Sequence, residues 1–393
     1  MLSFEDAYDR LLSGIVPLAA EDVPLEAARG RILAAPLIAK LTQPPFAASA
    51  MDGYAIRWAD MPGPWTVRGE SAAGAGFAGS VEKGAAIRIF TGAPIPGGAD
   101  TVIVQEDVER SGDTLTLKGG GPPDIGAHIR PEGNDYSNGQ ELLPVGSLVS
   151  APVVGLAASA GHARLQVHAA PRVAIIATGD ELVPPGTPPG PSQIVAGNGP
   201  MIAAALAAAG ADVEDFGIVP DDRTQIRDAL MRASKFDIVI TIGGASVGDH
   251  DLVKDALDDA GATLDFWRIA IKPGKPLIAG TLGAARLVGL PGNPVSAYVC
   301  MLLFVRPMVL ALRGADPTLG ETNARLGQPL PANGDRRDHL RATLSGDVVA
   351  PLATQDSAQL AALARANSLI IRPPHAKPAA TGESVPVLIL DRT

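Results

Sequence analysis

The sequence has little cysteine, few aromatic residues and no excess of positive charge, and each shortage excludes a class of protein. A single cysteine, Cys300, in 393 residues excludes an internal disulfide and a cysteine-rich metal site. The 32 lysine and arginine residues against 42 acidic residues give a net charge of −10. That balance argues against nucleic acid or an acidic membrane as a general partner, so any bound anion must be held by local groups.

Other absences bear on localisation and catalysis. The first residues have neither a basic nor an apolar segment, and no uninterrupted run of about 18 apolar residues occurs. We therefore expect a cytoplasmic protein without a membrane partner. The six histidines lack the spacing of metal ligands, and no G-x-S-x-G motif or cysteine–histidine pair supports acyl transfer. Chemistry based on positioned charge and a metal ion remains.

The residues that are present predict a multidomain protein of α/β plus β class. Helical periodicity in residues 1–42 and 140–170 indicates an elongated N-terminal or linker domain, and 43–139 read as a small β domain. Residues 171–316 alternate buried strands with helices, which predicts a doubly wound, mostly parallel sheet. A second small β domain is expected over 317–393.

Ligands of such sheets bind beyond the carboxyl ends of the strands, where this sequence places glycines, hydroxyls, acids and lysines. Residues 243–248 offer glycines and Ser246 at a strand-to-helix junction, which suits either a phosphate site or a plain tight turn. Four acids follow the same strands and are either Mg²⁺ ligands or solvated helix-cap residues: Asp180, Glu181, Asp249 and Asp251.

The stretch 272–297 combines two lysines with the start of a helix. Asn293 is expected to cap that helix and Pro294 to be its first residue, leaving free amides that attract an anion. Lys272 and Lys275 lie one short strand upstream and would add positive charge. An ordinary loop with solvated lysines would have the same sequence pattern. The Lys-Pro-Gly-Lys-Pro motif alone favours this ordinary loop over an anion site.

Six short motifs occur in order along nearly the whole chain: Ser-Ala-Met-Asp-Gly-Tyr-Ala (49–55), Thr-Gly-Ala-Pro (91–94), Thr-Gly-Asp-Glu-Leu (178–182), Gly-Gly-Ala-Ser-Val-Gly-Asp (243–249), Lys-Pro-Gly-Lys-Pro (272–276) and Leu-Pro-Gly-Asn-Pro-Val-Ser-Ala (290–297). This series resembles the molybdopterin molybdenumtransferases, bacterial molybdenum insertases that are similar to the E domain of gephyrin. The resemblance implies a transferase of molybdenum cofactor biosynthesis. Such an enzyme inserts molybdenum from molybdate into adenylylated molybdopterin, releases AMP and depends on Mg²⁺.

The resemblance also implies a homodimer with a shared active site and molybdopterin adenylyltransferase as a further partner. Asp52 and Thr91 would complete the pocket from the partner chain, acting as catalytic residues with Glu181 and Asp251. The metal ligands would be Glu181, Asp249 and Asp251. The substrate-binding residues would be Gly243, Gly244, Ser246, Gly248, Lys272, Lys275, Arg268, Asp221, Asp135, Pro291, Asn293, Pro294 and Ser296.

Some positions depart from the family pattern. Arg268 stands where a lysine is common, and Arg341 and Ser357 align only loosely, so their roles stay open. Two other functions are kept as alternatives. A molybdopterin adenylyltransferase shares the α/β domain but usually lacks the flanking β domains, and a scaffold like gephyrin would bind protein partners without catalysis.

Overall fold

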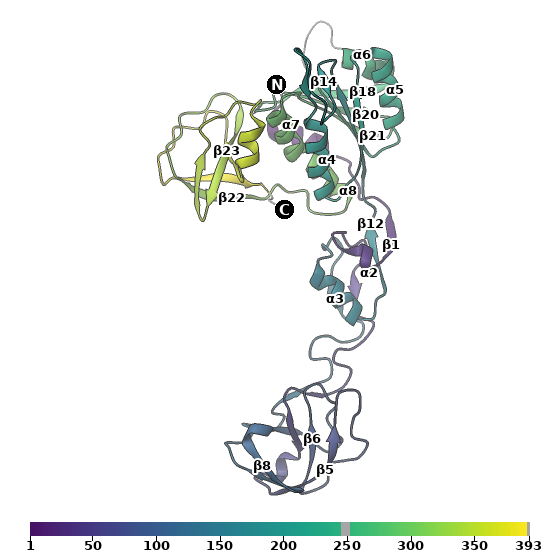
Figure 1. Ribbon diagram of the computed structural model, residues 1–393, viewed down its shortest axis with the longest axis vertical. Coiled ribbons are helices and arrows are strands. Elements are labelled where there is room, and N and C mark those ends of the chain that lie inside the picture. The colour runs from purple at the N-terminus through teal and green to yellow at the C-terminus, as the bar shows by residue number, and fades with distance from the viewer. Residues whose placement is uncertain (245–251, 391–393) are drawn as a thin grey trace. The chain divides into compact units, whose positions relative to one another are not determined.

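The structure is a computed structural model that describes residues 1–244 and 252–390, and these residues divide into two units (Figure 1). The first unit comprises Met1–Glu21, Gly30–Ala34 and the chain from Gln166 onward. The second comprises Asp22–Arg29 and Ala35–Leu165. The multidomain α/β plus β class is as expected, whereas the finer division into four domains stays a prediction.

The centre of the first unit is a six-stranded sheet with the order β16-β13-β17-β21-β20-β18. Its first four strands are parallel, and β20 and β18 are antiparallel to their neighbours. The bounds are β13 (Arg172–Thr178), β16 (Asp212–Val219), β17 (Ile238–Ile242), β18 (Ala262–Arg268), β20 (Pro276–Leu282) and β21 (Ala285–Leu290). The mostly parallel sheet is therefore confirmed.

Helices cover both faces of this sheet, because alternate residues of the buried strands join two separate cores. In β13, Val173 and Ile175 pack into one core, while Ala174 and Ile176 pack into the other. The first core includes residues of α1 (Phe4–Leu12), α4 (Asn198–Ala208), α7 (Pro294–Cys300) and α8 (Arg306–Leu312). The second includes residues of α5 (Arg223–Ala233) and α6 (Leu252–Asp259). This is the doubly wound arrangement expected from the sequence.

One part of the sheet differs from the expectation. Residues 276–290 were expected to contain one short strand, but they form the antiparallel hairpin β20–β21. Gly283, at a φ of 61°, lies in the turn between the two strands. The hairpin separates the Lys272–Lys275 segment from the helix that begins at Pro294.

That helix runs from Pro294 to Leu312 through α7, a π-helical segment η3 (Met301–Val305) and α8. Within the described chain it is the one helix long and apolar enough to cross a membrane by length and composition. Inside the protein, 78% of its apolar window is buried, so it is the core helix of this unit. The count of uninterrupted apolar residues missed it because Arg306 breaks the run.

The C-terminal part of the first unit forms a small β barrel. Its strands pair in the order β23-β24-β22-β26-β25, and a further pairing of β25 with β23 closes the ring. The short strand β19 (Ile271–Lys272) adds to β23 in parallel. The other elements are β22 (Glu321–Leu326), β23 (Arg337–Ser345), β24 (Val348–Pro351), α9 (Leu360–Arg365), β25 (Ser368–Arg372) and β26 (Ser384–Ile389).

The first helix, α1, packs into the first unit. Ser3 caps it by accepting a hydrogen bond from the Asp6 amide at 3.0 Å. Phe4 is buried against Phe304, with ring centroids 5.5 Å apart. We had expected α1 to share a domain with residues 140–170, but this apolar contact holds it in the unit that contains the α/β sheet.

The second unit contains a six-stranded sheet of the order β7-β4-β6-β5-β9-β8, flanked by short strand pairs. It is the small β domain that the alternating pattern predicted. The elements of the sheet are β4 (Gly53–Ile56), β5 (Trp65–Ser71), β6 (Ala85–Ile89), β7 (Thr101–Val104), β8 (Val108–Ser111) and β9 (Thr114–Leu117). The remaining elements of this unit are α2 (Leu25–Ala28), β2 (Leu37–Ile38), β3 (Ala48–Ser49), η1 (Trp58–Asp60), η2 (Gln105–Asp107), β10 (Ile129–Arg130), β11 (Glu141–Leu143) and α3 (Ala151–Ser159). The paired strands β1 (Ala20–Pro24) and β12 (Arg164–His168) each contain residues of both units.

Candidate active site

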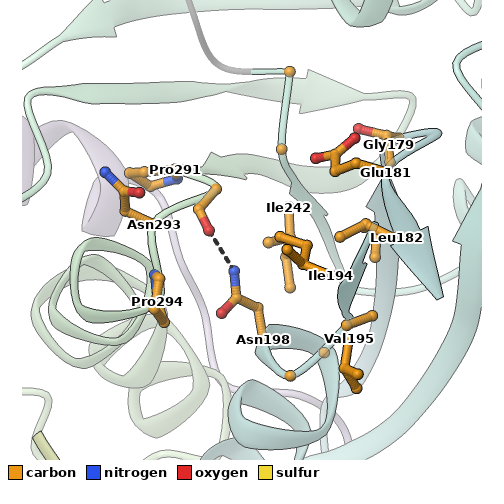
Figure 2. A pocket seen from close by; sticks show the side chains of 18 of the residues that line it. Gly179, Glu181, Leu182, Ile194, Val195, Asn198, Ile242, Pro291, Asn293 and Pro294 are labelled. Carbon is orange, nitrogen blue, oxygen red and sulfur yellow. Dashed lines mark hydrogen bonds between the residues drawn. The ribbon is translucent and has the colours of Figure 1, made fainter. Parts of the chain in front are cut away.

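A cavity of about 870 Å³ opens at the carboxyl ends of the parallel strands in the first unit. Its walls come from the turns after β13, β17 and β21, from the start of α4, and from Ala358 and Leu360 next to the barrel. Figure 2 shows Pro291, Asn293 and Pro294 on one side and Gly179, Glu181 and Leu182 on the other. We call this cavity the rim pocket.

Two carboxylates of the described residues line the rim pocket. Glu181 follows β13 and is exposed. Gly179, two residues before it, has a φ of 149°, a backbone conformation that favours glycine. Asp221 follows β16, and its amide donates to Asp180 Oδ1 at 3.0 Å. The Asp180 amide donates in return to Asp221 Oδ2 at 3.4 Å. This reciprocal pairing fixes the ends of the two neighbouring strands and holds Asp221 at the pocket.

The turn after β17 is built from two glycines with positive φ, Gly243 at 99° and Gly244 at 60°. A Cβ on Gly243 would lie 2.6 Å from the Thr178 carbonyl oxygen, and one on Gly244 would lie 2.1 Å from Val253 Cγ2. No side chain fits at either position. The Gly243 amide donates to the Leu290 carbonyl at 3.2 Å, so it is not available to a ligand. Four expected site residues fall outside the described chain: Ser246, Gly248, Asp249 and Asp251.

The turn before α7 forms the opposite wall and is held from two sides. Asn198, the first residue of α4, donates from Nδ2 to the Gly292 carbonyl at 2.6 Å, as Figure 2 shows. Asn293 donates from Nδ2 to Ser357 Oγ at 3.1 Å. Ser296 is 5% exposed and does not line the pocket.

The start of α7 differs from the expectation in one respect. Pro294 is the first helical residue, as expected, but the Asn293 side chain makes no capping hydrogen bond. The amide of Val295 donates instead to the Ser357 carbonyl at 3.0 Å, so the backbone of residue 357 supplies the cap. The Val295 amide is therefore not free to bind an anion, although the sequence suggested that it would be.

The three basic residues expected at the site do not line the rim pocket, and neither does any other lysine or arginine of the described chain. Lys272 forms an ion pair with Asp338 of β23, with Nζ and Oδ2 3.2 Å apart. Lys275 and Arg268 are exposed. Among the described residues, the charged side chains of the cavity wall are therefore all acidic.

The expected residues of the second unit form a separate cluster. Asp52 directly precedes β4 and Thr91 follows β6 by two positions. Thr91 donates to Asp52 Oδ1 twice, from its amide and from Oγ1, each at 2.8 Å. These bonds, together with the charge of Arg88, hold the pKa of Asp52 below its usual value. Asp135 is exposed in the same unit, and its amide donates to the Gln43 carbonyl at 3.0 Å.

Sequence reasoning missed the apolar wall of the rim pocket. Ile194 and Val195 of β15 (Ile194–Val195) line the cavity with 58% and 44% of their surfaces exposed, and β15 pairs with β14 (Leu182–Val183). Exposed large apolar side chains inside a cavity are typical of a ligand wall. Nothing in the sequence marked them, because residues 183–197 read as a loop rich in proline and glycine.

Oxygen donors of the kind that Mg²⁺ prefers are present, but they do not form a complete metal cluster among the described residues. Glu181 and Asp221 place two carboxylates on the pocket wall. In residues 1–244 and 252–390, no three histidine, cysteine, aspartate or glutamate side chains gather as a metal site. The donors fit Mg²⁺, which commonly takes one or two carboxylates and completes its shell with water and phosphate oxygens.

Comparison with protein families defines the class of protein to which this fold and pocket belong. Residues 2–161 match the MoeA N-terminal region (domain I and II), and residues 323–390 match the MoeA C-terminal region (domain IV). Between them, residues 174–311 match a probable molybdopterin binding domain, which contains the rim pocket for the most part. The chain thus has the three regions of a MoeA-type protein in order.

Individual relatives narrow the class to one family. The chain is 38% identical to the molybdopterin molybdenumtransferase of Haemophilus influenzae, over 80% of this chain and 78% of the relative. It is 36% identical to molybdopterin molybdenumtransferase 2 of Mycobacterium tuberculosis, over 93% and 94%. A crystal structure of the molybdopterin biosynthesis MoeA protein from Pyrococcus horikosii superposes with a TM-score of 0.85 at 30% identity, covering 100% of both chains. The chain belongs to the molybdopterin molybdenumtransferase family.

Proposed function

We propose that this chain inserts molybdenum from molybdate into adenylylated molybdopterin and releases AMP. The observation that carries the proposal is the rim pocket itself, which lies for the most part in the region that matches a probable molybdopterin binding domain. Its volume of about 870 Å³ suits a ligand of this size. Family membership over nearly the full chain supports the same reaction.

The described residues divide the binding work between polar and apolar walls. The glycine turn at Gly243 and Gly244 lets the backbone approach the phosphates, and the turn from Pro291 to Pro294 closes the opposite side. Lys272 and Lys275 would hold phosphate or molybdate near the pocket, with Arg268 beside them as a planar donor. Positioning and charge would be the contribution of the protein, because the exchange takes place between pterin sulfurs and molybdate oxygens.

Mg²⁺ would be held by Glu181 with Asp249 and Asp251, the last two lying outside the described residues. A bound Mg²⁺ offsets negative charge on the phosphate oxygens from which AMP departs. Asp221 would orient the substrate from the neighbouring strand end. Chelation with EDTA should abolish AMP release, and added Mg²⁺ should restore it.

The central test is AMP release from adenylylated molybdopterin with Mg²⁺ and molybdate. Glu181→Gln should lower the rate at least about a hundredfold, because it removes a metal-binding charge without changing shape. Glu214→Gln, on an exposed edge of β16, is the matched control and should keep the parent rate. Full activity in Glu181→Gln would overturn the assignment. ATP consumption with free molybdopterin would instead identify an adenylyltransferase.

We further propose a cytoplasmic homodimer in which Asp52 and Thr91 of the partner subunit complete each site. The support is that Asp52 and Glu181 belong to different units of the chain. Glu181→Gln and Asp52→Asn, each inactive alone, should together regain about a quarter of parental activity on co-expression, since half of the dimers then hold one intact site. A site completed within one chain would leave the mixture inactive. The same preparations can be tested for binding of molybdopterin adenylyltransferase.

A further inference from the structure

Arg88 of β6 is held from four directions in the second unit. Its guanidinium lies over the rings of Tyr54 and Phe90, 5.2 Å and 4.8 Å from their centroids. Nη1 donates to the Gly53 carbonyl at 3.0 Å, and Nη2 donates to Gln105 Oε1 at 2.7 Å. Two stacking contacts and two directed hydrogen bonds restrict this side chain to one orientation.

Both groups that accept from Arg88 adjoin Asp52. Gly53 is the next residue in the chain and the first of β4. The Gln105 amide donates to the Asp52 carbonyl at 3.1 Å. Arg88 therefore fixes the peptide after Asp52 and the residue that binds its carbonyl. It acts from the middle of the sheet, because Arg88 and Tyr54 are cross-strand partners of β6 and β4.

The Asp52 carboxylate uses only one oxygen within the cluster. Both hydrogen bonds from Thr91 end on Oδ1, at 2.8 Å each. No hydrogen bond within the described chain occupies Oδ2. Asp52 is half-buried, so Oδ2 remains available to a ligand while Oδ1 is locked.

We propose that Arg88 is a positioning residue for the reaction: it fixes Asp52 so that Thr91 holds Oδ1 and Oδ2 is presented to the substrate. The inference rests on the proposed function, because it takes Asp52 to be a residue of the site. Arginine suits this task better than lysine, since a planar fork can serve two acceptors while it stacks on two rings. The positive charge also keeps Asp52 ionised, in addition to the larger effect of the Thr91 hydrogen bonds.

Two variants separate the charge of Arg88 from its geometry. Arg88→Gln removes the charge, so it should raise the pKa of Asp52 and move the acid limb of the kcat–pH profile upward by the same amount. Arg88→Lys keeps the charge but loses the fork. It should leave the acid limb in place and lower kcat about tenfold with little change in KM, as expected when an aligned group is misplaced. Arg110→Gln is the matched control, because Arg110 pairs with exposed Asp113 and donates to the Gly112 carbonyl without reaching Asp52.

The pKa of Asp52 is to be measured in the full-length protein by carboxyl NMR, with Asp52→Asn identifying the signal. A shift in Arg88→Gln that Arg110→Gln lacks supports the proposal, and unchanged titration and kinetics in both Arg88 variants would overturn it. A purely structural role would reduce the folded fraction without moving either pH profile, which also counts against the proposal. If Asp52→Asn itself keeps full activity, the role of Asp52 in the proposed function fails, whereas the NMR titration still reports on the Arg88 contact.

Discussion

At the scale of single residues, the rim pocket depends on positions where a side chain cannot be placed. Gly244 and Gly283 make a matched pair, since both have a φ near 60° in the left-handed region. A Cβ on Gly244 meets Val253 at 2.1 Å, whereas a Cβ on Gly283 meets nothing within 4 Å. The two glycines therefore separate the cost of the backbone conformation from the cost of the collision.

We expect Gly283→Ala to lower the free energy of unfolding by about 1 kcal/mol, the cost of a left-handed alanine. Gly244→Ala should lose a further 1–3 kcal/mol or so, because Val253 or the turn must move. It should also weaken pyrophosphate binding, which Gly283→Ala should leave unchanged. Urea unfolding and calorimetric titration measure the two effects. Equal losses of unfolding free energy at both positions would show that the contact with Val253 adds no cost.

Cys300 gives a second residue-scale prediction. The thiol is fully buried in the core helix, donates to the Gly274 carbonyl at 3.7 Å, and has its pKa raised by burial. Native protein should therefore resist Ellman's reagent at pH 8, and urea should release one reactive thiol per chain. Cys300→Ser provides the blank. Stoichiometric labelling within minutes in the absence of urea would show that the side chain is accessible.

At the scale of elements, the sequence predicts those strands and helices whose pattern is unambiguous. The apolar runs of β13 and β17 are buried on both faces, and α5 is one of the helices that the alternating pattern of residues 171–316 predicts. The hairpin β20–β21 was missed because glycines and alanines interrupt its apolar pattern. The two strands are recognisable only by their partners in the sheet: β20 pairs with β18, and β21 pairs with β17.

The candidate site was predictable to a similar degree. Residues immediately after predicted strands, such as Glu181, Asp221 and Gly243, do line one pocket. Ile194 and Val195 could not be predicted, because their role depends on a two-residue strand pair. The position of Lys272 beside Asp338 could not be predicted either, since it depends on contact with a barrel some 66 residues further along the chain.

The capping of α7 gives the element-scale prediction. Asn293→Ala removes one exposed hydrogen bond but leaves the Ser357 carbonyl on the Val295 amide. It should therefore cost only about 0.5 kcal/mol. Asp222→Ala is the matched comparison, because Asp222 does cap α5 through the Gln225 amide at 2.8 Å, and its loss should cost about 1 kcal/mol. Urea unfolding measures both losses of unfolding free energy. A larger loss for Asn293→Ala than for Asp222→Ala would show that the Asn293 side chain does cap α7.

At the scale of the whole first unit, three segments far apart in sequence meet at one aromatic cluster. Phe4 of α1 contacts Phe304 of the core helix and lies 6.2 Å from the ring of His339 in β23. Arg337 covers the ring of Phe4 at 4.3 Å and pairs with Glu5 and Glu321. The N-terminal helix, the α/β sheet and the barrel are therefore stabilised through shared contacts.

This cluster should make the first unit sensitive to acid. Burial, and then the charge of Arg337, lower the pKa of His339 from 6.5 to about 3, against a smaller opposing effect of the Lys272 backbone. Between those values the unfolded chain binds a proton that the folded chain does not. The free energy of unfolding should therefore be highest above pH 6.5 and fall as the pH is lowered toward 3, by up to about 1.4 kcal/mol per pH unit.

His339→Phe tests this assignment, because phenylalanine fills similar space beside Phe4 but does not titrate. Urea unfolding at intervals between pH 7.5 and 4.5 should give a shallower pH dependence for the variant than for the parent. His375→Asn, at an exposed turn with a φ of 57° that asparagine tolerates, should keep the parental slope. Parallel curves for parent and His339→Phe would mean that the acid sensitivity arises from carboxylates elsewhere, and that contact among helix, sheet and barrel does not depend on a neutral imidazole.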